Sequence, residues 1–310
     1  MTEILPPGFR SDFVDCNGLR LHVVHNGEAY NGTPLGDHRK PILMLHGFPE
    51  FWIAWERVME LLSEEYLILV PDQRGYNKSD APPSADDYKA RLLVQDMLTL
   101  TSNMLGDRTF SVAGHDWGAS IAYALAINFP QRIDHLLIAN GVHPICFQNA
   151  MIDHPEQAKA SAYFHILRSK DAAAHMFAND FAKTFSMFEK FSLTPWLDAE
   201  MKDLYRAAWH DKTRLAAMLH WYNSSPIIVP QEGKEVPPAP LYQADPDKFR
   251  VSMPHTLVWG MGDQALLKVS QEHLETYCND LRRIEIPDAD HWILHTHGPI
   301  VANALRELIA

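Results

Sequence analysis

The sequence predicts an α/β fold, a mostly parallel, doubly wound sheet with an inserted helical segment. Two observations lead to this prediction. Short continuous apolar runs of strand length alternate with longer helical patterns, and this alternation is typical of a parallel sheet covered by helices on both faces. The alternation stops between about 142 and 230, where Ala, Met, His and aromatic residues recur at helical spacing without a clear strand.

Seven segments are predicted as strands. Five are continuous apolar runs with the length of buried strands, namely 41–46, 66–71, 109–114, 135–140 and 255–260. The segment 282–287 is a weaker strand, and 19–24 alternates as an antiparallel edge strand would. Between the strands, one helix is predicted from the apolar face of 93–104 and another over 120–129.

The domain organisation follows from these elements. We expect residues 1–141 to form the first part of the core and 142–230 a helical cap, with 231–310 supplying a Pro-rich linker and the second part of the core. An insertion between the strands of an open sheet lies above their C-terminal ends, where ligands bind. The cap is therefore a candidate lid over a binding site.

Composition excludes several classes of protein. The 310 residues suit one domain with a sizeable insertion, and the net charge of -12 argues against binding nucleic acid or an anionic membrane. Three scattered cysteines (Cys16, Cys146, Cys278) argue against a disulfide framework and for a reducing compartment. The chain has neither a secretory apolar segment nor a run of roughly 18 apolar residues, so we expect a soluble cytoplasmic protein.

The strongest functional signal is the hexapeptide GHDWGA at 114–119, which joins a predicted strand to a predicted helix. This is the setting of a nucleophile elbow, in which small residues flank a strained turn and expose its central side chain. That position usually holds Ser, but here it holds Asp116. A carboxylate is ionised at neutral pH and can attack a saturated carbon, giving an ester on the enzyme that water must then cleave.

Three further positions complete a possible site. The motif HGFP at 46–49 follows a strand and suits an oxyanion hole made by the backbone N–H groups of Phe48 and Trp117, and the bond between Phe48 and Pro49 could be cis. Asp263 and His291 each follow a predicted strand, so both can converge with Asp116. The order Asp, Asp, His is that of nucleophile, acid and base, with Asp263 orienting His291 and His291 activating water.

Two motifs point to other chemistry. The segment 260–265 fits G-x-G-x-x-A after a strand, but too little chain follows it for the further strand–helix units of a dinucleotide-binding fold. His291, His295 and His297 could suggest a metal cluster, but no Cys or acidic partner has matching spacing. We therefore expect no cofactor and no metal.

Together these stretches resemble the α/β-hydrolase superfamily and, within it, the epoxide hydrolases. The resemblance rests on LHGFPEFWIAW (45–55), DQRGYNKSDAP (72–82), GHDWGA (114–119), GMGD (260–263) and ADHW (289–292), which span most of the chain outside the insertion. It implies Asp116 as nucleophile and Asp263 with His291 as the charge-relay pair. It also implies that two cap tyrosines hold the epoxide oxygen.

The two tyrosines are assigned by similarity to family segments. An A-S-x-Y-like segment at 160–163 indicates Tyr163, and an L-x-W-Y segment at 219–222 indicates Tyr222. A phenol has an ordinary pKa near 10, so at neutral pH it can donate a hydrogen bond to a developing alkoxide. Tyr205 and His165 are the nearest substitutes for Tyr163, and since one branch of the family uses a histidine there, His165 or His175 stays open.

The resemblance implies conversion of a small-molecule epoxide and water to a vicinal diol through an ester on Asp116. The alternative is a dehalogenase with the same chemistry. Haloalkane dehalogenases usually need a second halide donor, which Phe48 does not offer, and haloacetate dehalogenases carry arginines where this chain has Trp117 and Ser120. A non-catalytic ligand receptor on this fold is a third possibility, which the intact Asp–Asp–His set disfavours.

Overall fold

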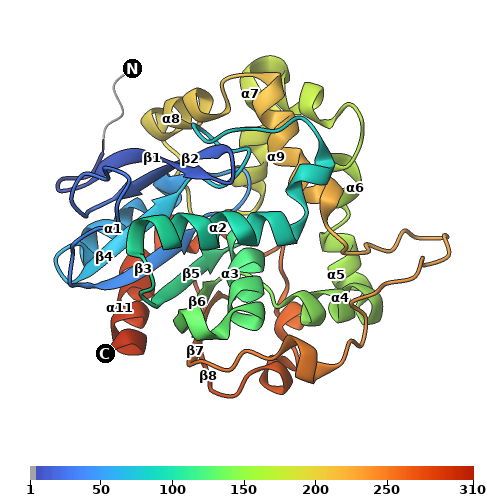
Figure 1. Ribbon diagram of the computed structural model, residues 1–310. Coiled ribbons are helices and arrows are strands. Elements are labelled where there is room, and N and C mark those ends of the chain that lie inside the picture. Colours follow the sequence, from blue (N-terminus) through green and yellow to red (C-terminus); the bar gives the residue numbers. More distant parts are fainter. Residues whose placement is uncertain (1–4) are drawn as a thin grey trace.

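The computed structural model describes residues 5–310 (Figure 1). Within them, eight strands form one sheet in the order β1-β2-β4-β3-β5-β6-β7-β8. The β1–β2 and β2–β4 pairs are antiparallel and the other neighbouring pairs are parallel. The strands are β1 (Arg10–Cys16), β2 (Leu19–His25), β3 (Lys40–Leu45), β4 (Tyr66–Pro71), β5 (Phe110–His115), β6 (Ile133–Ala139), β7 (His255–Gly260) and β8 (Leu281–Ile286).

The predicted fold class is confirmed, and the seven predicted strands correspond to β2–β8 with ends shifted by at most one or two residues. The sequence did not predict β1. This strand lies at the edge of the sheet, and only Val14 and Cys16 of its seven residues are buried. An edge strand with one face in water carries charges at many positions, so it lacks the apolar run by which the central strands are recognised.

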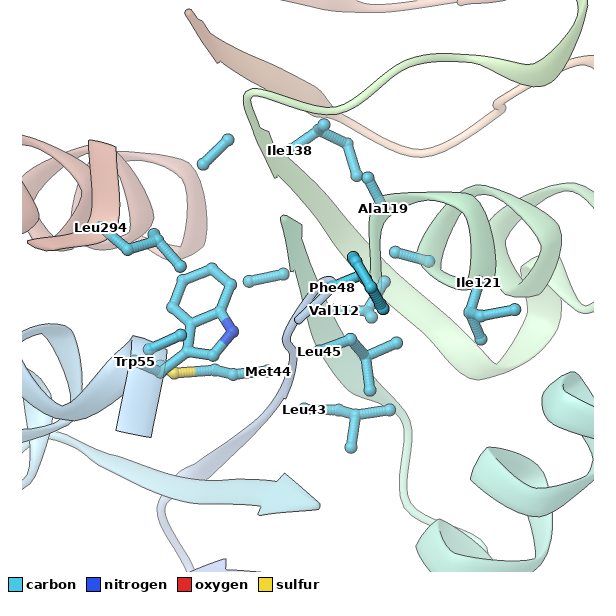
Figure 2. Packing of buried hydrophobic residues seen from close by; sticks show 14 of the residues in the cluster. Leu43, Met44, Leu45, Phe48, Trp55, Val112, Ala119, Ile121, Ile138 and Leu294 are labelled. Carbon is cyan, nitrogen blue, oxygen red and sulfur yellow. The ribbon is translucent and has the colours of Figure 1, made fainter. Parts of the chain in front are cut away.

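The central strands are buried on both faces because successive side chains point to opposite sides of the sheet. Figure 2 shows this for β3, where Met44 points toward Trp55 while Leu43 and Leu45 point to the other side, toward the helix that carries Ile121. All five of these side chains are almost completely buried. Two helical layers are therefore needed, one for each face.

Five helices flank the sheet. They are α1 (Glu56–Leu62), α2 (Ala90–Leu105), α3 (Trp117–Asn128), α10 (Ile293–Thr296) and α11 (Gly298–Ile309). Helices α2 and α3 pack together in front of the sheet in Figure 1, and α1 packs on α11. The prediction that the second helix begins at Ser120 was wrong, because α3 begins at Trp117, directly after Asp116. The connection from β5 to α3 is thus a single residue.

Between β6 and β7 the chain forms six α-helices, and no strand lies within 142–230. They are α4 (Pro144–Asp153), α5 (Pro155–Ala160), α6 (Tyr163–Leu167), α7 (Ala172–Lys190), α8 (Ala199–Trp209) and α9 (Lys212–Ser224). We call this region the cap, and its exact boundaries stay a prediction. Helix α7 is interrupted at 178–181, where Asn179, Asp180 and Phe181 have left-handed backbone angles.

Side chains of the cap are bonded to backbone carbonyls of the core. The indole N–H of Trp209 donates to the Pro49 oxygen at 2.7 Å, and that of Trp221 donates to the Arg74 oxygen at 3.0 Å. Both indoles are buried. A buried N–H that lost its acceptor would incur a penalty of about 1–3 kcal/mol, so these bonds hold the cap on the core.

The three cysteines are free and buried. Among the helices of residues 5–310, none combines the length and apolar character that crossing a membrane requires.

Candidate active site

Asp116 occupies a strained turn between β5 and α3, with φ 49° and ψ −120°. The turn packs against the neighbouring loop so closely that only glycine fits around it. A Cβ on Gly47 would lie 2.4 Å from the Asp116 Cβ, and one on Gly118 would lie 2.1 Å from the Leu45 oxygen. Left-handed backbone at a non-glycine residue is unfavourable and concentrates at functional sites. The strain and the two glycines together present the Asp116 carboxylate in a fixed direction.

The Asp116 carboxylate faces two of the predicted partners. Its Oδ1 accepts the backbone N–H of Phe48 at 2.8 Å, and its Oδ2 lies 3.7 Å from His291 Nε2. The peptide bond between Phe48 and Pro49 is cis. Trp117 is the first residue of α3, where the backbone N–H has no acceptor within the helix. The structure therefore brings the proposed nucleophile, base and oxyanion-hole residues to one place.

His291 is paired with Asp263 on its other side. Its Nδ1 lies 2.8 Å from Asp263 Oδ2. The Asp263 side chain is fully buried, and its Oδ1 accepts the backbone N–H groups of Ala265 and Leu266 at 2.8 and 2.9 Å. The Asn140 amide donates to Oδ2 at 2.7 Å. Asp263 is thus held as an acceptor on both oxygens, which fixes the direction of the His291 ring.

The charges around His291 decide its protonation. Burial disfavours the imidazolium, but Asp263, its hydrogen bond to the ring and the charges of Asp116 and Glu50 outweigh burial and raise the pKa of His291 to about 9. Burial likewise opposes ionisation of Asp263, but the partners around it, His291 first, hold its pKa below the ordinary value. At neutral pH His291 is therefore an imidazolium, and it lies between the side chains of Asp263 and Asp116.

Tyr163 and Tyr222 meet in the cap near Asp116. Their ring centroids are 6.3 Å apart, and the Tyr222 ring lies 5.0 Å from those of both Phe48 and Trp117. Burial and then nearby groups, Asp116 among them, raise the pKa of both phenols well above the ordinary value. Both phenols are therefore protonated and able to donate.

The family model for the alpha/beta hydrolase fold matches residues 40–298. The chain belongs to the α/β-hydrolase fold family. An AB hydrolase superfamily protein of Bacillus subtilis (strain 168), YfhM, is 30% identical over 97% of this chain and 98% of its own length. Epoxide hydrolase 4 of Mus musculus is 29% identical over 93% of this chain and 76% of its own length.

Solved structures share the fold of this chain. One, from work on novel epoxide hydrolases of the alpha/beta hydrolases superfamily in metagenomes from hot environments, has a TM-score of 0.82 and 28% identity, covering 97% of this α/β-hydrolase and 99% of that chain. An epoxide hydrolase of Bacillus megaterium in complex with an inhibitor has a TM-score of 0.80 and 23% identity, covering 96% of this chain and 99% of its own. At this identity, the similarity shows only that the two chains share a fold.

A cavity of about 220 Å³ opens from Asp116 in this α/β-hydrolase. Most of its wall is apolar, and Tyr163 forms part of it. Its polar lining residues are Asp116, Tyr88, Tyr163, Ser120, Ser224 and Ser225, and no Lys, Arg or His of the described chain lines it. Such a cavity accommodates a neutral, largely apolar ligand.

The alternatives to Tyr163 lie elsewhere in the cap. His175 lines a second hollow, between α6 and α7, which shares Tyr163 with the first cavity but does not include Asp116. His165 is in the wall of neither hollow. The Tyr205 hydroxyl donates to Glu50 at 2.8 Å, so it is already engaged with a core carboxylate. Of the four candidates, Tyr163 alone shares the cavity of Asp116.

Sequence reasoning missed Glu50, which is buried beside the site. Its Oε1 accepts from Tyr205 and lies 2.6 Å from His295 Nε2, and its Oε2 lies 3.4 Å from His115 Nδ1. His115 in turn donates through Nε2 to the His291 oxygen at 2.8 Å. Burial opposes ionisation of Glu50, but His295 and His115 hold its pKa well below the ordinary value. Glu50 directly follows the HGFP motif, and this position could have indicated from the sequence that it lies near the site.

Asn140, the partner of Asp263, was also missed. It directly follows β6, which lies between β5 and β7 in the sheet. Its side-chain oxygen accepts the Gly260 N–H at 2.8 Å while its amide holds Asp263. The signal was its position, because a polar residue at the C-terminal end of a central parallel strand lies at the ligand-binding edge.

The two competing motifs have other structural roles. The loop after Gly260 leads to a short 3₁₀ turn (Lys268–Gln271) and not to an α-helix whose N-terminus could bind a pyrophosphate. The three histidines have separate partners, since His291 pairs with Asp263, His295 with Glu50, and His297 lies near Asp288. Over residues 5–310, no three or more His, Cys, Asp or Glu side chains are grouped as a metal ion would require.

Proposed function

We propose that the protein is an epoxide hydrolase that converts an epoxide to a vicinal diol through an ester on Asp116. One observation carries the proposal: the elbow carboxylate lies between the Phe48 N–H and His291, in a cavity that it shares with the Tyr163 phenol. A carboxylate, a base and protonated phenols are the groups that this two-step chemistry needs. The relatives named epoxide hydrolase support the same function.

In the first step, Tyr163 and Tyr222 donate hydrogen bonds to the epoxide oxygen. Asp116 attacks a ring carbon, the C–O bond of the ring breaks, and an ester forms. The alkoxide released from the ring takes up a proton through the phenols, and His291, protonated in the free enzyme, supplies it to the site. The step thus converts the ion pair of Asp116 and His291 into a neutral ester and a neutral imidazole.

In the second step, neutral His291 acts as the base. With Asp116 esterified, one of the charges that raised the pKa of His291 is absent, so the imidazole can take a proton from water. The resulting hydroxide adds to the ester carbonyl, and the oxyanion is held by the N–H groups of Phe48 and Trp117. The diol oxygen leaves with the proton of His291, and the Asp116 carboxyl proton returns to His291.

The lack of a second halide donor and the composition of the cavity wall disfavour the dehalogenase alternative. A haloalkane dehalogenase usually needs a second halide donor beside the indole of Trp117, and Phe48 offers no side-chain N–H for this purpose. A haloacetate dehalogenase needs cations for the substrate carboxylate, and the described cavity lining contains none. We infer a neutral, apolar epoxide as substrate and water as co-substrate, with no cofactor or metal. A cytoplasmic location stays a prediction.

A product assay separates these functions. Purified protein is incubated with 1,2-epoxyhexane, 1-chlorohexane and fluoroacetate, and both diol and halide are measured. We expect diol from the epoxide and no halide above the level of a protein-free control. Halide release without diol would replace the proposal by the dehalogenase alternative, and neither product from any compound would favour a non-catalytic receptor.

A further inference from the structure

The loop that carries His291 is bonded to the cap on both sides of the histidine. Before it, Asp290 is 1% exposed, and its Oδ2 accepts the backbone N–H of Leu193 at 2.5 Å. After it, the Trp292 indole donates to the Phe188 oxygen at 3.0 Å. Phe188 and Leu193 belong to one stretch, 188–193, formed by the end of α7 and the loop that follows. We call this stretch the α7 end segment.

The α7 end segment also contacts the other groups of the site. The Leu193 side chain lies so close to Gly262 that a Cβ there would be 2.2 Å from Leu193 Cδ1, and Gly262 directly precedes Asp263. The Phe191 ring lies 6.3 Å from that of His291 and 5.9 Å from that of Tyr163. One short piece of the cap therefore contacts the base, the loop of its acid partner and a candidate oxygen-binding phenol.

Asp290 is suited to fasten these parts together. A buried carboxylate is unfavourable unless its oxygens are hydrogen-bonded, and here each oxygen accepts a backbone N–H. One donor is Leu193 in the cap, and the other is Trp292 in the His291 loop, at 2.8 Å from Oδ1. Because backbone donors move only with the chain, the carboxylate fixes the spacing between the two segments. The bonds described for Asp290 are with backbone, so it acts on His291 indirectly.

We propose that Asp290 is a positioning residue, which fastens the His291 loop to the α7 end segment and thereby sets the imidazole against Asp116. The inference rests on the proposed function, because it assigns Asp290 to the ester-hydrolysis step. His291 Nε2 and Asp116 Oδ2 are 3.7 Å apart, so a small shift of the ring changes the path by which water reaches the ester. In ester formation His291 supplies a proton only through the phenols, and the new bond is made by Asp116, so this step is affected less.

The test compares Asp290→Asn with Asp288→Asn in a single turnover of 1,2-epoxyhexane. Asparagine preserves shape, but its NH₂ would face a backbone N–H donor and break one of the two bonds. Asp288 lies in the same loop with an 84% exposed side chain, so its variant is the matched control. Mass spectrometry of quenched samples gives the rates of ester formation and ester hydrolysis separately.

We expect Asp290→Asn to slow ester hydrolysis by about 10- to 100-fold and ester formation by less than about threefold, while Asp288→Asn leaves both rates unchanged. The pH at which hydrolysis is half-maximal should also move in Asp290→Asn, since the surroundings of the His291 ring change. Leu193→Pro is the second variant. It removes the donor on the cap side, together with the side-chain contact of Leu193 with Gly262, and should reproduce the hydrolysis defect.

Equal loss of both steps, with no change in the pH profile, would reduce Asp290 to a structural residue and overturn the inference. Unchanged hydrolysis in Leu193→Pro would overturn it as well, even if Asp290→Asn failed to fold. Absence of any ester in the parent protein would instead contradict the proposed function, so the two failures are distinguishable.

Discussion

The core and the cap hold their candidate catalytic groups in different ways. Asp116, Asp263 and His291 each follow a parallel strand and are fixed by hydrogen bonds, for example from the Phe48 N–H to Asp116 and from His291 to Asp263. Tyr163 and Tyr222 lie on the cap helices α6 and α9 and are held chiefly by aromatic rings. Hydrogen bonds fix direction, whereas ring packing tolerates rearrangement.

This difference separates the two tasks of the site. In the proposed mechanism, the charges that would make and break the ester belong to the part held by hydrogen bonds, where a displaced group would be costly. The groups proposed to bind the epoxide oxygen belong to the cap, where apolar side chains can be exchanged with less loss of stability. We therefore expect substitutions in the core to abolish a chemical step and substitutions in the cap to weaken one.

The largest effect is expected for Asp116→Ala. Removal of the nucleophile should lower diol formation by on the order of 10⁴-fold or more, because no ester can form. Steady-state product assays measure the loss, and circular dichroism checks that the fold is kept. Asp288→Ala is the matched control on an exposed carboxylate and should retain full activity. Substantial steady activity in Asp116→Ala would remove this residue as the nucleophile.

His291→Gln should divide the reaction in two. The variant should lose ester hydrolysis much more than ester formation, because the base is needed to activate water in the second step. The ester then accumulates and adds the mass of the epoxide to the protein, which intact-protein mass spectrometry detects. An inactive variant that carries no adduct would contradict this division of labour.

The cap phenols should give a smaller, graded effect. Loss of one preorganised donor to a developing oxyanion typically costs on the order of 10²-fold, about 3 kcal/mol. Tyr163→Phe and Tyr222→Phe should each slow ester formation by up to that amount, and the double variant by more, in single-turnover rates. Tyr88→Phe is the control, since this cavity phenol donates to the Pro82 oxygen instead. If Tyr163→Phe formed the ester at the parent rate, the oxygen-binding role would have to belong to another cap residue.

The smallest effect concerns stability and follows from the pKa of His291. A pKa raised to about 9 stabilises the fold fully below the unfolded value near 6.5, and this contribution is lost as the pH rises toward 9. The free energy of unfolding should therefore fall between pH 6.5 and 9 more steeply in the parent than in His291→Gln. Urea titrations at the two pH values measure both slopes, and identical slopes would mean that His291 is not the titrating group.

The contrast between core and cap also explains which features the sequence alone could predict. Strands β5 and β7 were recognised as apolar runs, so their C-terminal ends, and with them the places of Asp116 and Asp263, were predictable. The family resemblance then supplied the expected roles, which stay proposals. The edge strand β1 carries no such run and escaped prediction.

Other features depend on contacts between distant parts of the chain. Glu50 meets His295 across 245 positions, and Asp290 meets Leu193 across 97, so local patterns do not reveal either pair. In the cap, the choice between Tyr163 and His175 depends on which hollow each side chain lines. That arrangement follows from the packing of α6 against the interrupted α7, which helical spacing does not determine.

The covalent ester on Asp116 is the central claim, and an isotope experiment tests it most directly. Excess enzyme is mixed with an epoxide in ¹⁸O-labelled water for a single turnover, and both products are analysed by mass spectrometry. Because the oxygen added to the diol comes from the Asp116 carboxylate, the first diol should be unlabelled and the label should appear in the protein, at Asp116. Label in the first-turnover diol, with none in the protein, would mean direct attack by water and would contradict the account.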